Sequence, residues 1–266
     1  MNEKNLDWNN FTKKLSPAIT EDKINKEWLS AVDRIKRKII VLDDDPTGIQ
    51  TVHSIPVYTS WDFSTLRQIM KDKHKVIYIL TNSRALTSIE TQGLHKQLAM
   101  DLKQIALKEE KNFLLISRSD STLRGHYPIE TKTIYDELKK DEEIDGEIII
   151  PFFLEGGRFT FNDIHYVKEQ DILVPIGQTE FARDSVFGYK SSNLKEWIEE
   201  KTAGQYPAGQ VISISLKMLR EKDIKGIVHK LLKIKNFNKV IVNAVEYTDL
   251  KVFLIALSES INRGKN

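Results

Sequence analysis

Short apolar runs alternate along the chain with segments in which apolar residues recur every three or four positions. The continuous runs are typical of buried strands, and the longer spacing is typical of amphipathic helices. Strands are expected at residues 38–42, 76–80, 112–116, 148–150, 210–214 and 240–242. This alternation predicts an α/β fold with a three-layer, mostly parallel sheet flanked by helices. Right-handed crossovers would place the ligand loops at the C-terminal ends of the strands.

The N-terminal part of the chain has a different pattern. Residues 1–20 are polar and weakly patterned, which predicts an irregular lead-in. Apolar residues at helical spacing from Ile24 to Ile35 then predict a first helix. We therefore expect residues 1–37 to form a lead-in and helix, and residues 38–266 to form an α/β domain. No internal repeat or linker divides the chain further.

Composition excludes several classes of partner. The 40 basic and 38 acidic residues leave a net charge of +2, which gives no reason to expect a nucleic-acid partner. The absence of cysteine excludes disulfides and thiolate metal sites. There is no apolar run of about 18 residues and no signal-peptide pattern, so no membrane partner is expected. A cytoplasmic location fits these features.

Polar stretches follow the expected strands where each strand ends. The longest is Ser117–Gly125, which comes before Pro128, a residue suited to the first position of a helix. Others are Asp43–Gly48, Thr81–Arg84 and Pro151–Arg158. One such stretch alone could be a capped turn. Their recurrence at strand ends, where open α/β sheets bind ligands, indicates a shared cleft.

Arginine is concentrated in these polar stretches, although the chain has 30 lysines and only 10 arginines. Residues 42–51, 80–86, 117–128, 151–166 and 179–193 contain a single lysine, Lys190, and five arginines: Arg84, Arg118, Arg124, Arg158 and Arg183. The planar guanidinium group binds carboxylate or phosphate bidentately, as lysine does not. The pattern indicates a small anionic ligand that also carries hydroxyls. Structural arginine–aspartate pairing at the loop bases is the alternative.

Asp43, Asp45 and Thr47 fit the Asp-x-Asp-x-Thr pattern of Mg²⁺-dependent phosphatases with an aspartyl nucleophile. There the first aspartate attacks phosphorus and the second handles the proton. Thr81 suits the second motif of such enzymes, but the later pair of metal-binding acids is missing. Binding of sugar hydroxyls by the aspartates, or a helix-capping turn, remain the other interpretations of this stretch.

Two glycines in Glu155-Gly156-Gly157-Arg158 predict a close approach of the backbone to another group. The stretch fits either an anion-binding backbone nest beside Arg158 or a tight turn. The chain has neither the phosphate-binding loop of nucleoside triphosphatases nor the glycine fingerprint of dinucleotide sites. No histidine pairs with another at metal-ligand spacing, so no metal site is expected.

Several of these motifs together resemble the four-carbon acid sugar kinase family. They are, in the order of that family, DDDPTGIQT at 43–51, LTNSRA at 80–85, SRSDSTLRGH at 117–126 and PFFLEGGR at 151–158. TEFARD at 179–184 and FGY at 187–189 also look like it. The similarity runs from about Ile39 to the C-terminus.

The resemblance implies a kinase with two domains, of which the N-terminal one binds the sugar acid and the C-terminal one binds ATP. This sequence matches only the N-terminal domain. ATP and Mg²⁺ are therefore expected through the missing domain, which could be a separate partner subunit. The implied reaction is phosphorylation of threonate, erythronate or a 3-oxo-tetronate at the terminal hydroxyl. The chain could be a truncation, half of a split enzyme or a non-catalytic sugar-acid-binding protein, and alone it is expected to be inactive.

The resemblance also assigns roles to residues. Asp45 and Asp120 are the expected catalytic residues: either can hold substrate hydroxyls, and one of them orients the attacking oxygen, because phosphoryl transfer depends on positioning and charge stabilisation. The candidates for gripping the substrate carboxylate are Arg84, Arg118, Arg124 and Arg158. The expected substrate-binding residues are Asp44, Thr47, Arg84, Arg118, Ser121, Thr122, Arg124, Glu155, Gly156, Gly157, Arg158 and Arg183.

Overall fold

The computed structural model describes residues 4–266, except for the side chains of residues 49–51. Its contacts divide the chain into two compact units. Unit 1 contains the residues up to Ile35, Ser121–Leu123 and Ile144–Asn266, and unit 2 contains Lys36–Asp120 and Arg124–Glu143. Parallel strands flanked by helices confirm the α/β prediction. The parallel strands lie in two sheets rather than one. The sequence pattern did not predict this division, because periodicity identifies a strand but not its neighbour.

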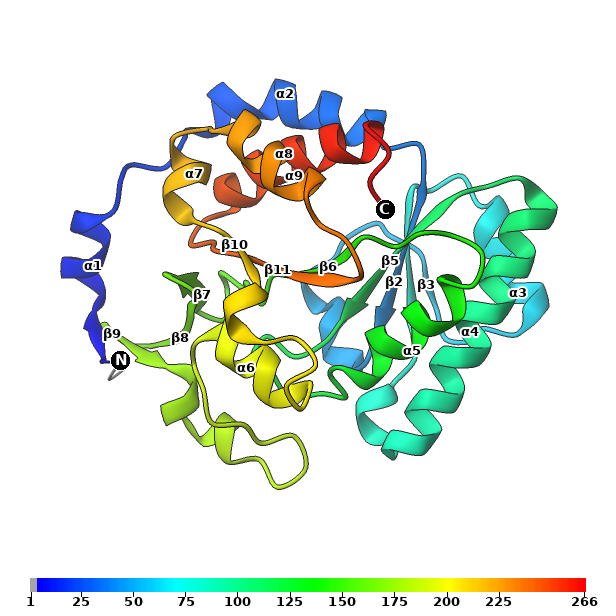
Figure 1. Cartoon of the computed structure of the whole chain (residues 1–266), viewed down its shortest axis with the longest axis horizontal. Coiled ribbons are helices and arrows are strands. Elements are labelled where there is room, and N and C mark those ends of the chain that lie inside the picture. Colours follow the sequence, from blue (N-terminus) through cyan, green and yellow to red (C-terminus); the bar gives the residue numbers. More distant parts are fainter. Residues whose placement is uncertain (1–3) are drawn as a thin grey trace. The chain divides into compact units, whose positions relative to one another are not determined.

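Unit 2 is built on a four-stranded parallel sheet (Figure 1). Its order is β3 (Val57–Tyr58), β4 (Val76–Leu80), β2 (Lys38–Asp43) and β5 (Phe113–Arg118). Its helices are α3 (Phe63–Lys71), α4 (Ser88–Glu109) and α5 (Ile129–Leu138), with short 3-10 turns η1 (Pro46–Thr51) and η2 (Ser83–Ala85). Helices α4 and α5 pack against each other.

Local side-chain caps fix where two helices of unit 2, α3 and α4, begin. Asp62 accepts hydrogen bonds from two backbone N–H groups at the start of α3. Thr87 and Glu90 form a complete capping box at the start of α4. Such caps satisfy N–H groups that have no partner within the helix, and so they set the ends of the loops that follow the strands.

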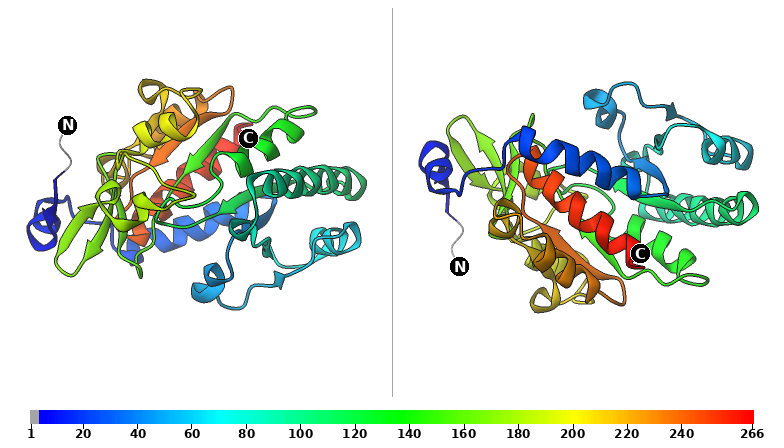
Figure 2. Two further views of the ribbon diagram at one scale, coloured as in Figure 1. Left: turned by 90° about the horizontal axis from the view of Figure 1, so that it is seen from below. Right: turned by 90° about the horizontal axis from the view of Figure 1, so that it is seen from above.

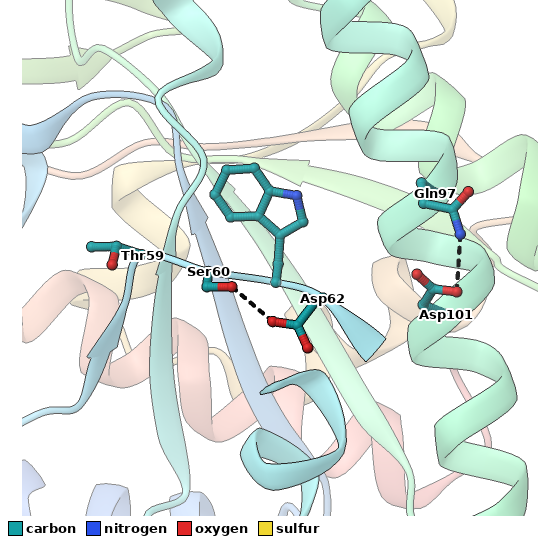
Figure 3. A pocket seen from close by; sticks show the side chains of 6 residues that line it. Thr59, Ser60, Asp62, Gln97 and Asp101 are labelled. Atoms are coloured by element: carbon teal, nitrogen blue, oxygen red, sulfur yellow. Dashed lines mark hydrogen bonds between the residues drawn. The ribbon is translucent and has the colours of Figure 1, made fainter. Parts of the chain in front are cut away.

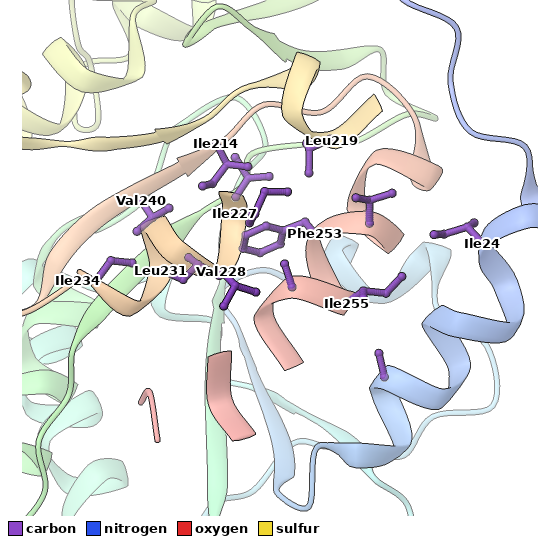
Figure 4. Packing of buried hydrophobic residues seen from close by; sticks show 14 residues of the cluster. Ile24, Ile214, Leu219, Ile227, Val228, Leu231, Ile234, Val240, Phe253 and Ile255 are labelled. Atoms are coloured by element: carbon purple, nitrogen blue, oxygen red, sulfur yellow. The ribbon is translucent and has the colours of Figure 1, made fainter. Parts of the chain in front are cut away.

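Unit 1 contains a three-stranded parallel sheet in the order β10 (Ile212–Ile214), β11 (Asn238–Val242) and β6 (Gly146–Ile149). Its helices are α2 (Glu21–Arg34), α6 (Leu194–Lys201), α7 (Leu216–Arg220), α8 (Ile224–Leu232) and α9 (Tyr247–Asn262). Helices α2 and α9 lie side by side (Figure 2). Their apolar faces meet the sheet in a core that includes Ile24, Val240 and Phe253 (Figure 4).

A second, antiparallel sheet in unit 1 has the order β1 (Leu6–Asp7), β9 (Ile172–Pro175), β8 (Ile164–Glu169) and β7 (Arg158–Phe161). Short turns follow at η3 (Ile176–Gln178), η4 (Glu180–Arg183) and η5 (Ala208–Gln210).

The expectation of an irregular lead-in was wrong for residues 6–14, which form a strand and a helix. Strand β1 pairs with β9, and α1 (Trp8–Lys14) follows it directly. Trp8 stacks on Phe159 at 4.9 Å between ring centroids, and Phe11 is buried in the same apolar cluster. Two aromatic residues three positions apart were the missed signal, because they bury a large area from a short helix. Residues 1–3 of the expected lead-in lie outside the described residues.

None of the described helices is both long enough and apolar enough to cross a bilayer.

Candidate functional site

The polar loops that follow β2, β4 and β5 meet at the C-terminal edge of the unit 2 sheet. Strand β2 lies between the other two, and its last residue, Asp43, is in register with Leu80 and with Arg118. Thr81 Oγ1 donates to the carbonyl oxygen of Asp43 at 2.8 Å, which ties the loop after β4 to the end of β2. Parallel strands therefore bring together motifs that lie about 40 residues apart in the sequence.

Asp44 and Arg84 form the most complete ion pair at this edge. Arg84 Nη2 and Nε donate to the two carboxylate oxygens of Asp44 at 2.6 and 3.0 Å, a bidentate arrangement. Ser119 Oγ donates to the same carboxylate at 2.8 Å. Burial raises the pKa of Asp44, although these hydrogen bonds oppose that effect. This pair is consistent with the structural arginine–aspartate pairing that the sequence left open.

Asp43 is fully buried, yet its carboxylate is poorly paired. Arg118 Nη1 lies 3.4 Å from Oδ1, beyond the usual range for such a bond, and Oδ2 has no hydrogen-bond partner among the described residues. Burial raises the pKa of Asp43 to about 6, against the opposing charge of Arg118. Gly48 covers the pair so closely that a Cβ atom would lie 2.3 Å from both groups. The Asp43–Arg118 pair is thus the least satisfied polar group of this edge.

The two expected catalytic aspartates have different surroundings. Thr47 donates to Asp45 Oδ1 through its backbone N–H at 2.8 Å and its hydroxyl at 2.5 Å. Although partial burial opposes it, hydrogen bonding by Thr47 lowers the pKa of Asp45. Asp120 accepts a hydrogen bond from Arg124 Nε at 2.7 Å. Both carboxylates lie in unit 2 and are already engaged, and Asp45 Oδ2 also accepts from Arg84 Nη1 of the loop after β4 at 3.2 Å.

Glu130 is a buried carboxylate that the sequence reasoning missed. It lies in the first turn of α5 and accepts hydrogen bonds from the hydroxyls of Ser83 and Ser117. These serines directly precede Arg84 and Arg118. The recurrence of a Ser-Arg pair at two strand ends was the available signal.

The Glu155–Arg158 stretch lies in unit 1, where its two glycines are required by geometry. Gly157 has a φ of +69°, and a Cβ atom on Gly156 would lie 2.4 Å from the Phe153 ring. Arg158 Nη1 donates to the carbonyl oxygen of Gly156, and its guanidinium carbon lies 5.7 Å from the centroid of the Phe181 ring. This stretch is therefore a tight turn with a cation–π contact.

Glu155 accepts a hydrogen bond from the Tyr247 hydroxyl at 2.5 Å. Partial burial and this bond raise the pKa of Tyr247 to about 12. Arg183, the last residue of η4, has an exposed side chain.

Ser121 and Thr122 belong to unit 1, although Asp120 and Arg124 on either side belong to unit 2. The carbonyl oxygen of Ser121 lies 2.8 Å from His165 Nε2, and that of Thr122 accepts a hydrogen bond from Tyr189 at 2.6 Å. The expected site residues are thus divided between the units. Unit 2 contains Asp44, Asp45, Thr47, Arg84, Arg118, Asp120 and Arg124, and unit 1 contains Ser121, Thr122, Glu155, Gly156, Gly157, Arg158 and Arg183.

The described residues contain no group of three side chains placed to hold a metal ion. The three adjacent aspartates do not converge, because Asp44 is held by Arg84, Asp45 turns back to Thr47, and Asp43 is buried beside Arg118. The residues of unit 2 that the structure describes therefore do not fit a bound Mg²⁺ ion.

A shallow hollow of about 420 Å³ also lies in unit 2, between the start of α3 and the side of α4 (Figure 3). Its carboxylates are engaged nearby, since Ser60 Oγ donates to Asp62 at 2.8 Å and Gln97 donates to Asp101 at 3.0 Å. None of the expected site residues lines it. Its lining offers no arginine or lysine for an anionic ligand.

The family model described as "Sugar-binding N-terminal domain" matches residues 39–266 of this chain. No protein among those with curated functions matches it.

Two solved structures have a similar fold. A Haemophilus influenzae protein of the DUF1537 family is 16% identical and superposes with a TM-score of 0.56, over 85% of this chain and 57% of that protein. A Bordetella bronchiseptica domain of unknown function (DUF1537), described with bound citrate as a domain-swapped dimer, is 17% identical with a TM-score of 0.53, over 85% and 57%. The likeness shows the fold alone, and the chain spans just over half the length of these proteins.

Proposed function

The chain belongs to the family of sugar-binding N-terminal domains, and we propose that it binds a small sugar acid at the C-terminal edge of the unit 2 sheet. The observation that carries this proposal is the Asp43–Arg118 pair. Arg118 makes one long contact with a described side chain, and 31% of its side chain is exposed, so its other donors are available to a ligand carboxylate. Oδ2 of Asp43 has no hydrogen-bond partner among the described residues, but it is enclosed, so Asp43 acts on the ligand through its charge and its contact with Arg118.

Arg84 has a different role in this proposal. Its donors are occupied by Asp44 and Asp45, so it organises the loop rather than binding the ligand. The ligand carboxylate is therefore bound by one loosely paired and partly exposed arginine, Arg118, whose partner Asp43 is buried. The hydroxyls of a sugar acid would be held by Asp45 or Asp120, as the resemblance implies.

We further propose that the ligand is a four-carbon acid such as threonate, erythronate or a 3-oxo-tetronate, which is phosphorylated at its terminal hydroxyl. The sequence motifs support this reaction, and the bound citrate of the Bordetella structure supports a small carboxylate ligand. ATP and Mg²⁺ would come from a second domain or subunit. Asp45 and Asp120 would orient the attacking hydroxyl, since phosphoryl transfer needs positioning more than covalent chemistry.

Calorimetry with threonate, erythronate and the neutral polyol threitol tests the proposal. We expect the acids to bind and threitol to bind much more weakly, because it lacks the carboxylate for Arg118. Equal binding of threitol would contradict the anionic site. Release of phosphate from small phosphoesters with Mg²⁺, abolished in Asp43→Asn, would instead support the phosphatase interpretation and overturn the kinase one.

Substitution of Gly48 by alanine is expected to weaken sugar-acid binding by about tenfold. The new Cβ atom would lie 2.3 Å from both carboxylate oxygens of Asp43 and from Arg118 Nη1, so the Arg118 side chain must move. Gly93→Ala in α4 is the matched control, because no atom lies within 4 Å of its added Cβ atom. Calorimetry should show unchanged binding for the control; equal losses in both variants would contradict the close contact at Gly48.

Sugar-acid affinity is expected to rise several-fold as the pH falls from about 8 to 5. Because the pKa of Asp43 is about 6, its carboxyl becomes neutral over this range and no longer repels the anionic ligand. The ligand carboxylate stays ionised, since its pKa is about 3.5. Binding measured by calorimetry across the range should lose this dependence in Asp43→Asn.

The ionisation of Asp43 also makes the stability of the fold depend on pH. Folding raises the pKa of Asp43 from 3.8 to about 6. Its contribution to the free energy of unfolding is therefore complete below pH 3.8 and is lost as the pH rises through about 6. Asp43→Asn should therefore gain stability relative to the wild type above pH 6. Relative destabilisation of the variant on raising the pH would contradict the assigned shift.

A further inference from the structure

Glu130 joins the two loops that carry Arg84 and Arg118. Ser83 Oγ donates to Glu130 Oε1 at 2.6 Å, and Ser117 Oγ donates to Oε2 at 2.9 Å. One oxygen of the Glu130 carboxylate thus binds Ser83, which precedes Arg84, and the other binds Ser117, which precedes Arg118. The two oxygens have a fixed separation, so this bridge holds Ser83 and Ser117 at a set distance from each other.

Because Glu130 is buried, its carboxylate needs hydrogen-bond donors around it. The residue is 3% exposed, and a buried carboxylate is costly unless donors surround it. The two serine hydroxyls supply such donors, and its place in the first turn of α5 adds the favourable end of the helix dipole. His95 Nε2, 4.0 Å from Oε1, is its nearest ionic partner among the described side chains.

The loop after β4 is also held from α4. Thr91 Oγ1 donates to the carbonyl oxygen of Ser83 at 3.2 Å, and Thr81 Oγ1 lies 3.2 Å from the Ser83 hydroxyl. Ser83 itself is completely buried. The serine before Arg84 is therefore fixed on several sides, and Glu130 extends this fixed point to Ser117 on the other strand.

We propose that Glu130 is a positioning residue that sets the distance between the arginine loops and thereby the affinity for the sugar acid. This inference rests on the proposed function of the Asp43–Arg118 pair. Glu130 acts through Ser117 on Arg118 and needs no contact with the ligand. Its carboxylate shape matters more than its charge, because both of its hydrogen-bond partners are neutral hydroxyls.

Comparison of Glu130→Ala with Glu130→Gln tests this role. The alanine variant leaves both serines without their acceptor, and we expect sugar-acid affinity to fall about tenfold. In the glutamine variant the amide oxygen accepts from one serine and the amide N–H donates to the other, so affinity should stay within about threefold of the wild type. Ile134→Ala, a buried apolar residue in the same helix, is the control for lost stability without a lost bridge.

Two readouts separate positioning from general destabilisation. In a double-mutant cycle, Glu130→Ala should have little further effect on affinity when Arg118 is already glutamine, because it acts through that residue. Amide hydrogen exchange without ligand should rise in both residues 81–86 and residues 117–120 for Glu130→Ala but in neither for Ile134→Ala.

The possible outcomes separate the positioning role of Glu130 from the proposed sugar-acid binding. Equal affinity losses in Glu130→Ala and Ile134→Ala, additive effects with the Arg118 variant, or exchange unchanged at both loops would overturn the positioning role. Raised exchange at both loops in a chain that binds no sugar acid would support the bridge and overturn the proposed function. Rescue by glutamine together with non-additivity would support both.

Discussion

Replacement of Arg118 by glutamine is expected to weaken the binding of threonate or erythronate by about 10- to 100-fold. Arg118 is more loosely paired than Arg84 and Arg124, since its one contact with a described side chain is 3.4 Å long. A guanidinium group that binds a carboxylate contributes a charge-assisted, bidentate interaction, which a glutamine amide does not replace. Calorimetry with each acid measures the loss.

Arg67→Gln is the matched control for this change. Arg67 is also an arginine of unit 2 paired with a carboxylate, but it lies on α3 and 57% of its side chain is exposed. The control removes the same charge from the same unit. Because Arg67 lies on α3 and not at a strand end, its loss should leave sugar-acid affinity nearly unchanged. A similar weakening in both variants would mean that overall charge, rather than Arg118 itself, attracts the ligand.

Replacement of Arg84 by methionine is expected to destabilise unit 2 by about 3 to 5 kcal/mol. The change removes both guanidinium donors from Asp44, whose side chain is only 2% exposed, and leaves a buried carboxylate with Ser119 as its remaining side-chain donor. Burial already raises the pKa of Asp44, so an uncompensated charge there is costly. Urea unfolding followed by hydrogen exchange in β2 and β5 would report the loss for this unit.

Two further variants identify the cause. Arg67→Gln breaks an exposed pair and should cost about 1 kcal/mol or less. Asp44→Asn combined with Arg84→Met removes the stranded charge and should recover part of the lost stability. No recovery in the double variant would show that the aliphatic part of Arg84, rather than its charge, stabilises the loop.

The contrast between these two arginines could not be read from the sequence. Both follow a serine at a strand end, and both were expected to bind substrate. Whether the donors of each arginine are fully used depends on which aspartate the arginine contacts across the sheet. Arg84 reaches Asp44 at 2.6 Å, whereas Arg118 faces the buried Asp43 at 3.4 Å.

The three adjacent aspartates illustrate the same limit. The motif marked the stretch, and the roles expected for Asp45 and Asp120 remain predictions. Of these three aspartates, the structure instead singles out Asp43, which has a buried oxygen without a hydrogen-bond partner among the described residues. Asp43 is the last residue of β2 and is buried with the strand, whereas Asp45 lies beyond the strand, where it bonds to Thr47.

Local features of this protein were determined by the sequence alone. Apolar runs and helical stripes predicted the α/β class, which the structure confirms, because this signal depends on neighbouring residues. The ligand site that the polar residues at the strand ends predict stays a prediction. Only the tertiary structure decided the division into two units, the pairing of each arginine and the bridge made by Glu130. The pairs of Arg84 and Arg118 and the Glu130 bridge depend on contacts between residues 13 to 75 positions apart, and the spacing of apolar and polar residues contains no information about such partners.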